Sequence, residues 1–486
     1  MKAKEYNHHW IELEFESKEE QEQFIKKTSY KLEHAKYSSS YKSGLWDGTK
    51  KYLTTNNKCH KGIFKSIYPN HPLVCDLNFK SISFDNIPLF KNNLKYERRQ
   101  YQLDAINTIL KEKYGLITAA MGSGKTLIAA GTLSYHLAQN KNNKALFVCY
   151  DKNILTQSIK NFKEYGFNVS QFGDSIKDLS GDIIVATIQS LSKIKDPKSI
   201  LKQITFLFCD ESHHSKSKTS KTILTKLYNC KYYIGLTATP FKEGTVELAE
   251  LMSILGPVIF KFGFSDGVQE NRIVPVKVFF LDNGCDDKIK EIVFTRKNYQ
   301  FIWETAIQNN SFRNELVSKI TNTITNLLNT TNLILVDKID HGEEVLRALK
   351  KQQNLKSLAM YGEDNIFIRE SKKQLLSTDN INTLVSTVLT EGVDLKPSPV
   401  IAINASGRKG FIKLIQFIGR ITRPNPKFGK FRVAIDFIDR YNPILLHHSN
   451  ERIKACKSFG LEVVICKSVQ ELLVEIIKYY KETKEQ

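Results

Sequence analysis

A glycine-rich loop in the first third of the chain has the residues needed to hold phosphate. The stretch AAMGSGKT, residues 119–126, follows an apolar run and precedes an apolar helical pattern. Small residues let backbone N–H groups close around phosphate oxygens, and the N-terminus of the following helix adds a favourable dipole. In such a loop Lys125 reaches the β- and γ-phosphates of a nucleotide and the Thr126 hydroxyl binds Mg²⁺. Ala119 stands where the strict pattern has glycine, so a glycine-rich turn that only starts a helix remains the alternative. The backbone of the cradle would come from Gly122, Ser123 and Gly124.

Two neighbouring acids end a second apolar run farther along the chain. The run FLFCD closes with Asp210, and Glu211, Ser212 and His213 follow it. Asp210 would hold Mg²⁺ directly or through water, and Glu211 would orient or deprotonate an attacking water. The alternative is a helix cap, because an acidic tetrapeptide with serine often has that role after a strand. A lysine loop followed by an acid pair, each at the end of an apolar run, favours a nucleotide-hydrolysing site.

Short apolar runs with helix-like segments between them predict the sheets that position these residues. Runs of this length without alternation are typical of strands buried on both faces of a parallel sheet. The first set comprises GLITAA (115–120), ALFVCY (145–150), DIIVAT (182–187), FLFCD (206–210) and YYIGLTAT (232–239). The second set comprises NLILVD (332–337), NTLVST (382–387), PVIAINAS (399–406) and RVAIDFID (432–439). Two such sets predict an α/β fold with two parallel-sheet domains in tandem, whose ligand sites lie at the C-terminal ends of the strands.

The change in pattern along the chain predicts three parts. Residues 1–90 mix short alternating runs with a helical stretch, which predicts a small α+β domain. Residues 91–262 and 263–486 contain the two α/β domains, and the second ends in a helical extension with an amphipathic helix near 469–482. In that extension we expect Arg452 to serve packing or an auxiliary nucleic-acid contact.

The composition indicates a polyanionic partner. The chain has 486 residues, of which 41% are hydrophobic, and its 71 basic and 51 acidic residues give a net charge of +20. Such an excess suits nucleic acid or another anionic surface. Its apolar runs are too short to cross a bilayer, so we expect no membrane span. The eight cysteines are scattered, which indicates reduced thiols in a cytosol-like compartment.

The motifs occur in the order found in superfamily 2 helicases of the DExH type, which the chain resembles over about residues 95–440. The matching stretches are RQYQ (99–102), AAMGSGKT (119–126), TIQS (187–190), DESH (210–213), TATP (237–240), ST (386–387) with EGVD (391–394), and QFIGRITR (416–423). The resemblance implies two tandem RecA-like domains with ATP held between them.

The resemblance also implies a role for each matching residue. The first domain would supply Lys125, Thr126, Asp210 and Glu211, and the second would supply arginines that stabilise the transferring phosphate. The implied catalytic residues of the second domain are Gln416, Arg420 and Arg423. The implied nucleotide contacts are Arg99, Gln102, Gly392 and Asp394; the implied coupling residues are His213, Thr237 and Thr239; and the implied nucleic-acid contacts are Thr187, Gln189 and Thr387.

Lysines and aromatic rings alternate in the N-terminal part. Residues 36–65 carry seven lysines against one acid, with tyrosines, a tryptophan and a phenylalanine between them. Basic charge with rings that can stack suits single-strand or junction contacts. We expect Lys42, Lys50 and Lys51 to contact nucleic acid, and Trp46 to lie in the core of the small domain.

Four soft metal ligands also lie close together in this region, at Cys59, His60, His71 and Cys75. The adjacent Cys59 and His60 would have difficulty binding one ion tetrahedrally, and the usual paired spacing is missing. We therefore do not expect a zinc site here.

The segment YKSGLWDG (41–48) resembles a stretch ahead of the core in phage UvsW-type helicases, which remodel branched DNA. The resulting hypothesis is an ATP- and Mg²⁺-dependent DNA helicase that performs branch migration, fork regression and hybrid unwinding in phage-type recombination, repair and replication. Its expected partner is single-stranded, forked or four-way DNA, with RNA as a further possibility, and we expect a monomer in the cytoplasm, the host's if the chain is phage-encoded. The alternatives are an RNA helicase and a duplex-DNA translocase subunit that moves without separating strands.

Overall fold

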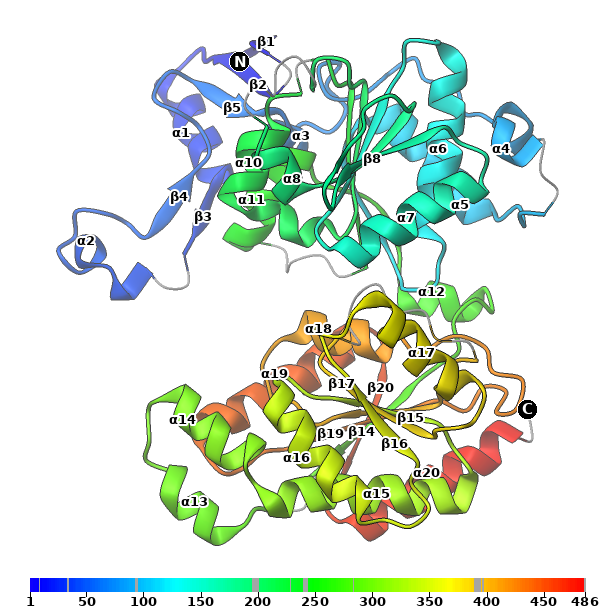
Figure 1. The fold of residues 1–486 in the computed structure, drawn as a ribbon. Helices are drawn as coiled ribbons and strands as arrows, with labels where there is room; N and C mark the ends of the chain where they lie inside the picture. Colours follow the sequence, from blue (N-terminus) through cyan, green and yellow to red (C-terminus); the bar gives the residue numbers. More distant parts are fainter. Residues whose placement is uncertain are drawn as a thin grey trace. The chain divides into compact units, whose positions relative to one another are not determined.

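The computed structural model describes residues 1–484 except 8, 33–34, 92–94, 195–200, 228, 239–243, 283, 389–394 and 396. The chain divides into two compact units (Figure 1). The first unit comprises residues 1–120 and 124–262, and the second comprises 263–486 with the short segment 121–123. The predicted fold class is confirmed, because each unit is built on a large parallel sheet and the first begins with a small α+β region.

The N-terminal region has its own antiparallel sheet, in the order β1-β2-β5. In β2 the side chains alternate, so Ile11 and Leu13 are buried while Glu12 and Glu14 face solvent. Ile11 and Leu13 belong to one apolar cluster with Leu116 and Leu146 of the large sheet, so this region packs as part of the first unit. Its elements are β1 (Lys2–Glu5), β2 (Trp10–Glu14), α1 (Lys18–Lys27), β3 (Ser29–Lys31), η1 (Ala35–Tyr37), α2 (Ser39–Lys42), β4 (Thr49–Lys51), β5 (Lys58–His60), α3 (Lys61–Ile67), η2 (Phe84–Asn86) and α4 (Pro88–Lys91).

The large sheet of the first unit has eight strands in the order β13-β6-β12-β11-β7-β10-β8-β9, and only β9 runs antiparallel to its neighbour. All five predicted apolar runs form strands here, because each is buried on both faces. The strands are β6 (Tyr114–Ala119), β7 (Ala145–Cys149), β8 (Val169–Gly173), β9 (Ile176–Lys177), β10 (Ile183–Thr187), β11 (Phe206–Cys209), β12 (Tyr232–Thr237) and β13 (Val258–Phe262).

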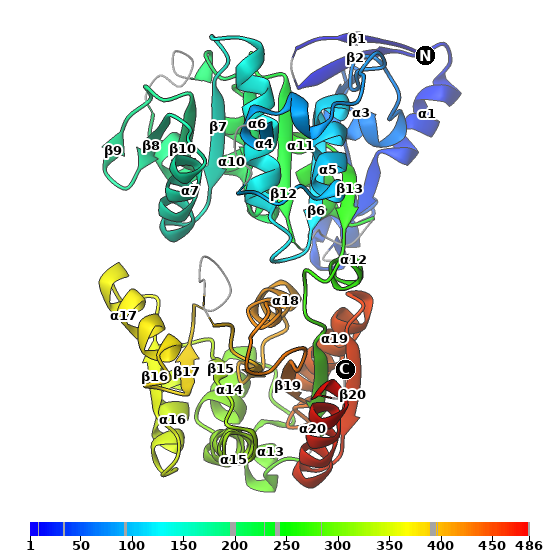
Figure 2. The ribbon, with the colours of Figure 1, turned by 90° about the vertical axis from the view of Figure 1, so that its right-hand side faces the viewer.

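Helices cover both faces of this sheet (Figures 1 and 2). One face packs against α5 (Gln100–Glu112), α6 (Lys125–Gln139) and α7 (Lys152–Glu164). The other packs against α8 (Ile188–Ser192), α10 (Lys218–Leu224) and α11 (Val246–Leu255). A short 3₁₀ helix, η3 (Ser212–Lys216), follows β11. This three-layer arrangement leaves the C-terminal ends of the strands open for a site.

The second unit repeats the architecture with a seven-stranded, all-parallel sheet in the order β16-β17-β15-β18-β19-β14-β20. The four predicted runs form β15 (Asn332–Leu335), β17 (Thr383–Ser386), β18 (Ile401–Asn404) and β19 (Val433–Phe437). Three further strands are β14 (Lys277–Leu281), β16 (Ser357–Met360) and β20 (Glu462–Cys466). Because β20 pairs with β14, part of the predicted helical extension completes the sheet.

Helices again form two layers. One face carries α15 (Ser311–Leu328), α16 (Ile339–Lys350) and α20 (Val469–Lys484), the predicted amphipathic helix. The other carries α17 (Ile366–Ser377), α18 (Phe411–Ile418) and α19 (Pro443–Ser458). The remaining helices are α12 (Phe264–Gln269), α13 (Asp287–Val293), α14 (Tyr299–Trp303) and η4 (Glu304–Gln308), a π-helix. None of the described helices has the length and apolar content needed to cross a bilayer.

Candidate nucleotide and nucleic-acid sites

The phosphate loop has the backbone geometry that a cradle requires. It leaves β6 after Ala119, and Gly122 and Gly124 adopt φ values of +81° and +79°. Side chains are strongly disfavoured at such φ values, so these positions favour glycine. Gly124 is the N-cap of α6, and the Lys125 ammonium at the start of that helix donates to the carbonyl oxygen of Ala119 over 3.1 Å. The loop therefore positions Lys125 at the helix N-terminus, where an anion is favoured.

The implied nucleotide contacts Arg99 and Gln102 lie at the start of α5. Gln102 on α5 is fully buried, and a Cβ atom added to Gly124 would stand 2.8 Å from its Nε2. Arg99, the N-cap of α5, pairs with Glu97 over 3.0 Å and donates to the Tyr101 hydroxyl over 3.3 Å. The Gln102 side chain therefore lies against Gly124 of the phosphate loop, and Arg99 is held at the start of the same helix.

The acid pair occupies a strained turn after β11. The Asp210 Oδ1 accepts from the backbone N–H of Glu211 over 3.0 Å, and Glu211 has a φ of +43°, a value that residues other than glycine rarely adopt. Glu211 starts η3, but its side chain does not cap that helix within the described part of the chain. Instead its Oε2 lies 3.4 Å from Nδ1 of the buried His213. Such strain is typical of functional sites, so the helix-cap interpretation accounts poorly for this turn.

The sheet brings the loop and the acid pair to one edge. Strand β12 lies between β6 and β11, with Thr237 opposite Thr118 of β6 and Gly235 opposite Cys209 of β11. Because the three strands are parallel, their C-terminal ends lie side by side. The phosphate loop, the buried Thr237 and the acid pair therefore gather along one edge of the sheet. Thr239 lies outside the described residues.

The first unit places Thr187 and Gln189 at the end of β10. Thr187 is the N-cap of α8: its Oγ1 accepts from the Ser190 amide over 3.3 Å and donates to the Ser190 hydroxyl over 2.9 Å. Only 5% of Thr187 is exposed. Gln189 is exposed and donates to the carbonyl oxygen of Tyr150 over 3.2 Å. Of the two, Gln189 is the more accessible to a ligand.

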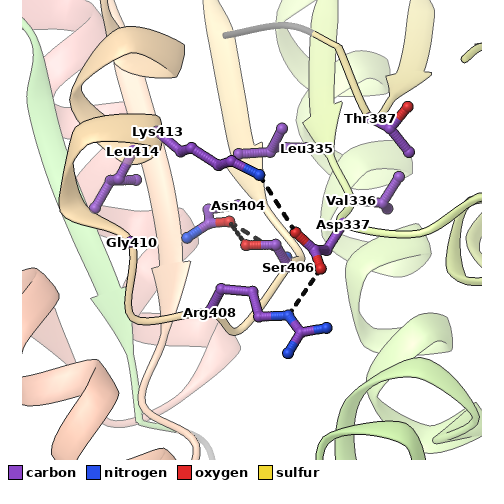
Figure 3. Close-up of a pocket in the computed structure, with 10 residues that line it drawn as sticks. All are labelled: Leu335, Val336, Asp337, Thr387, Asn404, Ser406, Arg408, Gly410, Lys413 and Leu414. Carbon is purple, nitrogen blue, oxygen red and sulfur yellow. Dashed lines mark hydrogen bonds and ion pairs between the residues drawn. The ribbon is translucent and has the colours of Figure 1, made fainter. Parts of the chain in front are cut away.

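A polar pocket lies at the C-terminal strand ends of the second unit, and Thr387 lines it (Figure 3). Figure 3 shows the Asp337 carboxylate between two basic side chains, at 2.8 Å from Nε of Arg408 and 3.7 Å from Nζ of Lys413. Sequence reasoning missed these three residues. The available signal was that Asp337 ends the predicted run 332–337 and that Arg408 follows the predicted run 399–406 by two residues, where ligand sites of parallel sheets lie. Lys413, on α18, carried no such signal.

A buried network of ion pairs and hydrogen bonds holds the loop that carries Arg408. Arg452 on α19 is fully buried and donates from Nε and Nη2 to the Asp436 carboxylate over 2.9 and 3.0 Å. Asp436 also accepts from the Asn404 amide over 2.8 Å, and Arg452 Nη1 donates to the Arg408 carbonyl over 3.1 Å. The guanidinium of Arg452 therefore ties β19 to the loop that carries Arg408, which gives this residue a packing role.

An aromatic side chain fixes the same loop. Trp303, fully buried at the junction of α14 and η4, donates from Nε1 to the Ser406 carbonyl over 2.8 Å. The Arg408 guanidinium lies over the Trp303 ring, with Cζ 3.9 Å from its centroid. The His341 ring packs edge-on against the indole. Burial, together with the charges of Arg313 and Arg408, lowers the pKa of His341 to about 3. Arg408 is thus held by stacking on one side and by Asp337 on the other.

The motif at residues 416–423 begins on α18. Gln416 is 1% exposed, and its amide nitrogen has no hydrogen-bond partner among the described residues. Arg420 and Arg423 follow the helix, and their carbonyl oxygens accept from Ser398 Oγ and Arg432 Nη2 over 3.0 and 2.7 Å. These bonds fix the backbone that carries the two guanidinium groups. Gly392 and Asp394 lie outside the described residues.

The N-terminal lysines differ in their surroundings. Lys42 ends α2 and is exposed, Lys51 lies 3.9 Å from Asp47, and Lys50 forms an ion pair with Glu250 of α11. Trp46 is half-buried and lies outside the core, so that expectation is wrong; it donates from Nε1 to the Thr49 carbonyl over 2.8 Å. Lys42 and Lys51 therefore present their charge to solvent more fully than Lys50, which is shared with a carboxylate.

The described residues contain no group of three or more histidine, cysteine and acidic side chains placed to bind a metal ion. Cys59 and His60 are buried, and burial raises the pKa of the Cys59 thiol to about 12 and lowers the pKa of His60 to about 3. Both groups are therefore neutral at physiological pH and act as core side chains.

A phosphate loop beside an acid pair at one edge of a parallel sheet suits a nucleotide-binding site. Residues 95–242 match the family described as "Type III restriction enzyme, res subunit". The chain is 25% identical over 374 residues to "Putative helicase 22" of Sulfolobus islandicus filamentous virus (isolate Iceland/Hveragerdi), covering 71% of this chain and 65% of that one, slightly less than two thirds of the relative's length.

It is 22% identical over 447 residues to the "ATP-dependent DNA helicase uvsW" of Enterobacteria phage T4, covering 85% of each chain. Among solved structures, the helicase MrfA bound to DNA and AMPPNP matches with a TM-score of 0.57 and 15% identity, covering 82% of this chain and 56% of that one, which supports the fold. These matches confirm the resemblance to superfamily 2 helicases that the motifs predict.

Proposed function

We propose that this enzyme is a DNA helicase that uses ATP to remodel branched or forked DNA. The observation that carries the proposal is the single sheet edge at which the phosphate loop, Thr237 and the Asp210–Glu211 turn meet. The same edge of the second unit presents Thr387 and a basic pair. Similarity to a phage DNA helicase along 85% of each chain supports DNA as the substrate, and so does the net charge of +20.

In this proposal the first unit binds the nucleotide and prepares the attacking water. The amides of Gly122, Ser123 and Gly124 surround the phosphates, and Lys125 contacts the β- and γ-phosphates. Glu211 accepts a proton from the water, and its contact with His213 keeps the carboxylate oriented. The strained Glu211 backbone fixes that orientation before substrate arrives.

The donors at this edge fit Mg²⁺. The Thr126 hydroxyl and the Asp210 carboxylate are hard oxygen ligands, and Mg²⁺ is usually bound by one or two protein ligands together with phosphate oxygens and water. When bound, the ion would neutralise charge that develops on the transferring phosphate.

The residues of the second unit would respond to the nucleotide. Arg420 and Arg423 have fixed charge and suit a transferring phosphate, as arginine fingers do. Gln416 suits a coupling role, because a buried amide nitrogen without a partner is costly until a ligand or a conformational change supplies one. His213, Thr237 and Thr239 would couple the first unit in the same way, and Arg99 and Gln102 would read the base.

DNA would be held mainly through its phosphates. Thr187, Gln189 and Thr387 offer hydroxyl and amide groups at strand ends. The pocket of the second unit adds Arg408 and Lys413, whose two positive charges are partly balanced by Asp337. Contacts of this kind position a strand without reading its sequence. The N-terminal residues Lys42, Lys50 and Lys51 would add further phosphate contacts.

The test is strand remodelling on a matched set of substrates. A forked DNA duplex, a four-way DNA junction, a blunt DNA duplex and a forked RNA duplex of the same sequence are each mixed with enzyme, ATP and Mg²⁺, and product strands are resolved on native gels. We expect conversion of the fork and the junction by the wild type and none by Lys125→Ala. Equal conversion of RNA and DNA forks would move the proposal to an RNA helicase. ATP hydrolysis on blunt duplex without strand displacement on any substrate would indicate a translocase.

A further inference from the structure

A basic arm projects from the N-terminal region of the first unit (Figure 1). Its described residues are 29–32 and 35–51. Strands β3 and β4 pair antiparallel at its base, with Ser29 opposite Lys51 and Lys31 opposite Thr49. Figure 1 shows the arm leaving the body of its unit, with α2 at its far end. Leu45 follows α2 by three residues, so it lies at the tip.

Specific bonds hold the arm in one shape. The Leu32 amide donates to the Gly48 carbonyl over 2.9 Å, and the Trp46 amide donates to the Ser40 carbonyl over 3.1 Å. Gly48 has a φ of +77°, and a Cβ there would stand 2.9 Å from both Ala35 and the Tyr41 ring. These bonds close the tip into a folded loop.

The base of the arm is joined to the large sheet's helix layer. Glu250 on α11 accepts from the Tyr52 hydroxyl over 2.9 Å and forms ion pairs with Lys50 and, over 3.4 Å, with Lys221. The Glu250 side chain is 16% exposed, so these contacts are partly shielded from water. An arm anchored in this way can transmit force from the motor unit to whatever its tip contacts.

The tip combines apolar and positively charged groups. Leu45 is 86% exposed and Tyr37 is 69% exposed. The described arm residues include five lysines and one acid. Lys36 directly precedes Tyr37, and Lys42 precedes Leu45 by three residues. Neither lysine forms an ion pair with any residue that the structure describes. Single exposed leucines are common, but a leucine at the end of a basic projection matches the apolar side chains that proteins insert between base pairs.

We propose that this arm is a wedge for the branch point of DNA. Leu45 packs against the last base pair of the duplex, where stacking partners are missing on one side. Tyr37 stacks on a base that has left the duplex, and Lys36 and Lys42 contact the phosphates on either side. The inference rests on the proposed function and adds to it the structure that the enzyme engages, namely the boundary between paired and unpaired DNA.

The experiment compares Leu45→Ala with Leu77→Ala, which removes a leucine that is 56% exposed outside the arm. A DNA fork carries 2-aminopurine in its last base pair, and binding is followed by fluorescence alongside binding to a single strand. The number of base pairs opened per ATP hydrolysed is measured on the same fork. Because both leucines are exposed, thermal unfolding of each variant should match that of the wild type.

For Leu45→Ala we expect the preference for fork over single strand to fall on the order of tenfold, with smaller fluorescence changes and fewer base pairs opened per ATP. Leu77→Ala should behave as the wild type. The double variant Lys36→Ala/Lys42→Ala should lower the slope of log Kd against log salt by about 2, whereas Lys18→Ala/Lys26→Ala, exposed lysines on α1, should leave it unchanged.

Two outcomes separate this inference from the proposed function. If the wild type opens forks and Leu45→Ala opens them equally well per ATP, the wedge is wrong and the helicase assignment stands. If the wild type neither hydrolyses ATP with DNA nor opens forks, the proposed function fails first. Fork-specific fluorescence that survives Leu45→Ala but is lost in Leu77→Ala would place the contact elsewhere on the first unit and would overturn the wedge.

Discussion

Replacing Arg452 with methionine should destabilise the second unit strongly. Methionine fills much of the same volume but removes the guanidinium that donates to both oxygens of Asp436, which is 1% exposed, and lies 3.7 Å from Asp439, which is 3% exposed. Arg313 remains paired with Asp439 over 2.9 Å, so Asp436 is the carboxylate that loses its buried positive partner. Removing one partner from a buried pair leaves an uncompensated charge and costs about 3–5 kcal/mol.

A matched exposed pair provides the control. Arg440 binds Asp282 through two bonds of 2.7 and 2.6 Å, but 49% of its side chain is exposed to solvent. Exposed pairs contribute about 0–1 kcal/mol, so Arg440→Met should have little effect although its geometry is equally good. The comparison isolates burial, since both variants remove a guanidinium that binds both oxygens of one carboxylate.

The assay uses urea denaturation followed by tryptophan fluorescence. Trp303 is the one tryptophan of residues 263–486, so replacing Trp10 and Trp46 with phenylalanine makes the signal report on the second unit. With a slope of about 2–3 kcal/mol per M, Arg452→Met should lower the midpoint by about 1.5 M, and Arg440→Met by less than about 0.5 M. Equal shifts for the two variants would show that the buried network does not stabilise this unit as argued.

Three further predictions concern a buried histidine and the nucleotide site. Burial lowers the pKa of His341 from 6.5 to about 3, so as pH falls below 6.5 the unfolded chain binds the proton before the folded one. The free energy of unfolding therefore falls by about 2 kcal/mol by pH 5. His341→Phe should reduce the fall in urea midpoint between pH 7 and pH 5. An unchanged pH dependence would refute it. Gly124→Ala places a Cβ against Gln102 and should weaken binding of a fluorescent ATP analogue about tenfold, whereas Gly166→Ala, at a similar φ of +88° but in open space, should not. Glu211→Gln should lower kcat by at least about 100-fold and leave the Kd for ATP nearly unchanged, and a proportional loss of binding would remove Glu211 from the role of base.

The parts of the fold that could be predicted from sequence are those with a uniform local pattern. The strands β6 and β11 are apolar on both faces, so their positions and the residues that follow them were evident. The edge strands β16 and β20 were missed, because their apolar runs, LAM and VVIC, are short and are not buried on both faces. The strand β14, KVFFL, is apolar but was not among the predicted runs.

The residues of the candidate sites also fall into a group that sequence could predict and a group that it could not. Lys125 and Glu211 belong to compact motifs, so their types and spacing were sufficient to predict their places. The positions of Arg313 and Asp439 could not be predicted, since their contact joins residues 126 positions apart and depends on how two helices and a strand pack. The stacking of Arg408 on Trp303 has the same origin. Local sequence pattern gives the residues at strand ends, whereas the side chains that fix them come from tertiary packing.

The most direct test of the central claim is steady-state ATP hydrolysis by the wild type and Lys125→Ala, each without nucleic acid and with single-stranded DNA, a four-way DNA junction and RNA. The account predicts turnover in the wild type that rises with DNA, most strongly with the junction, and no turnover above background in Lys125→Ala. Equal hydrolysis by the two proteins, in preparations free of other ATPases, would contradict it.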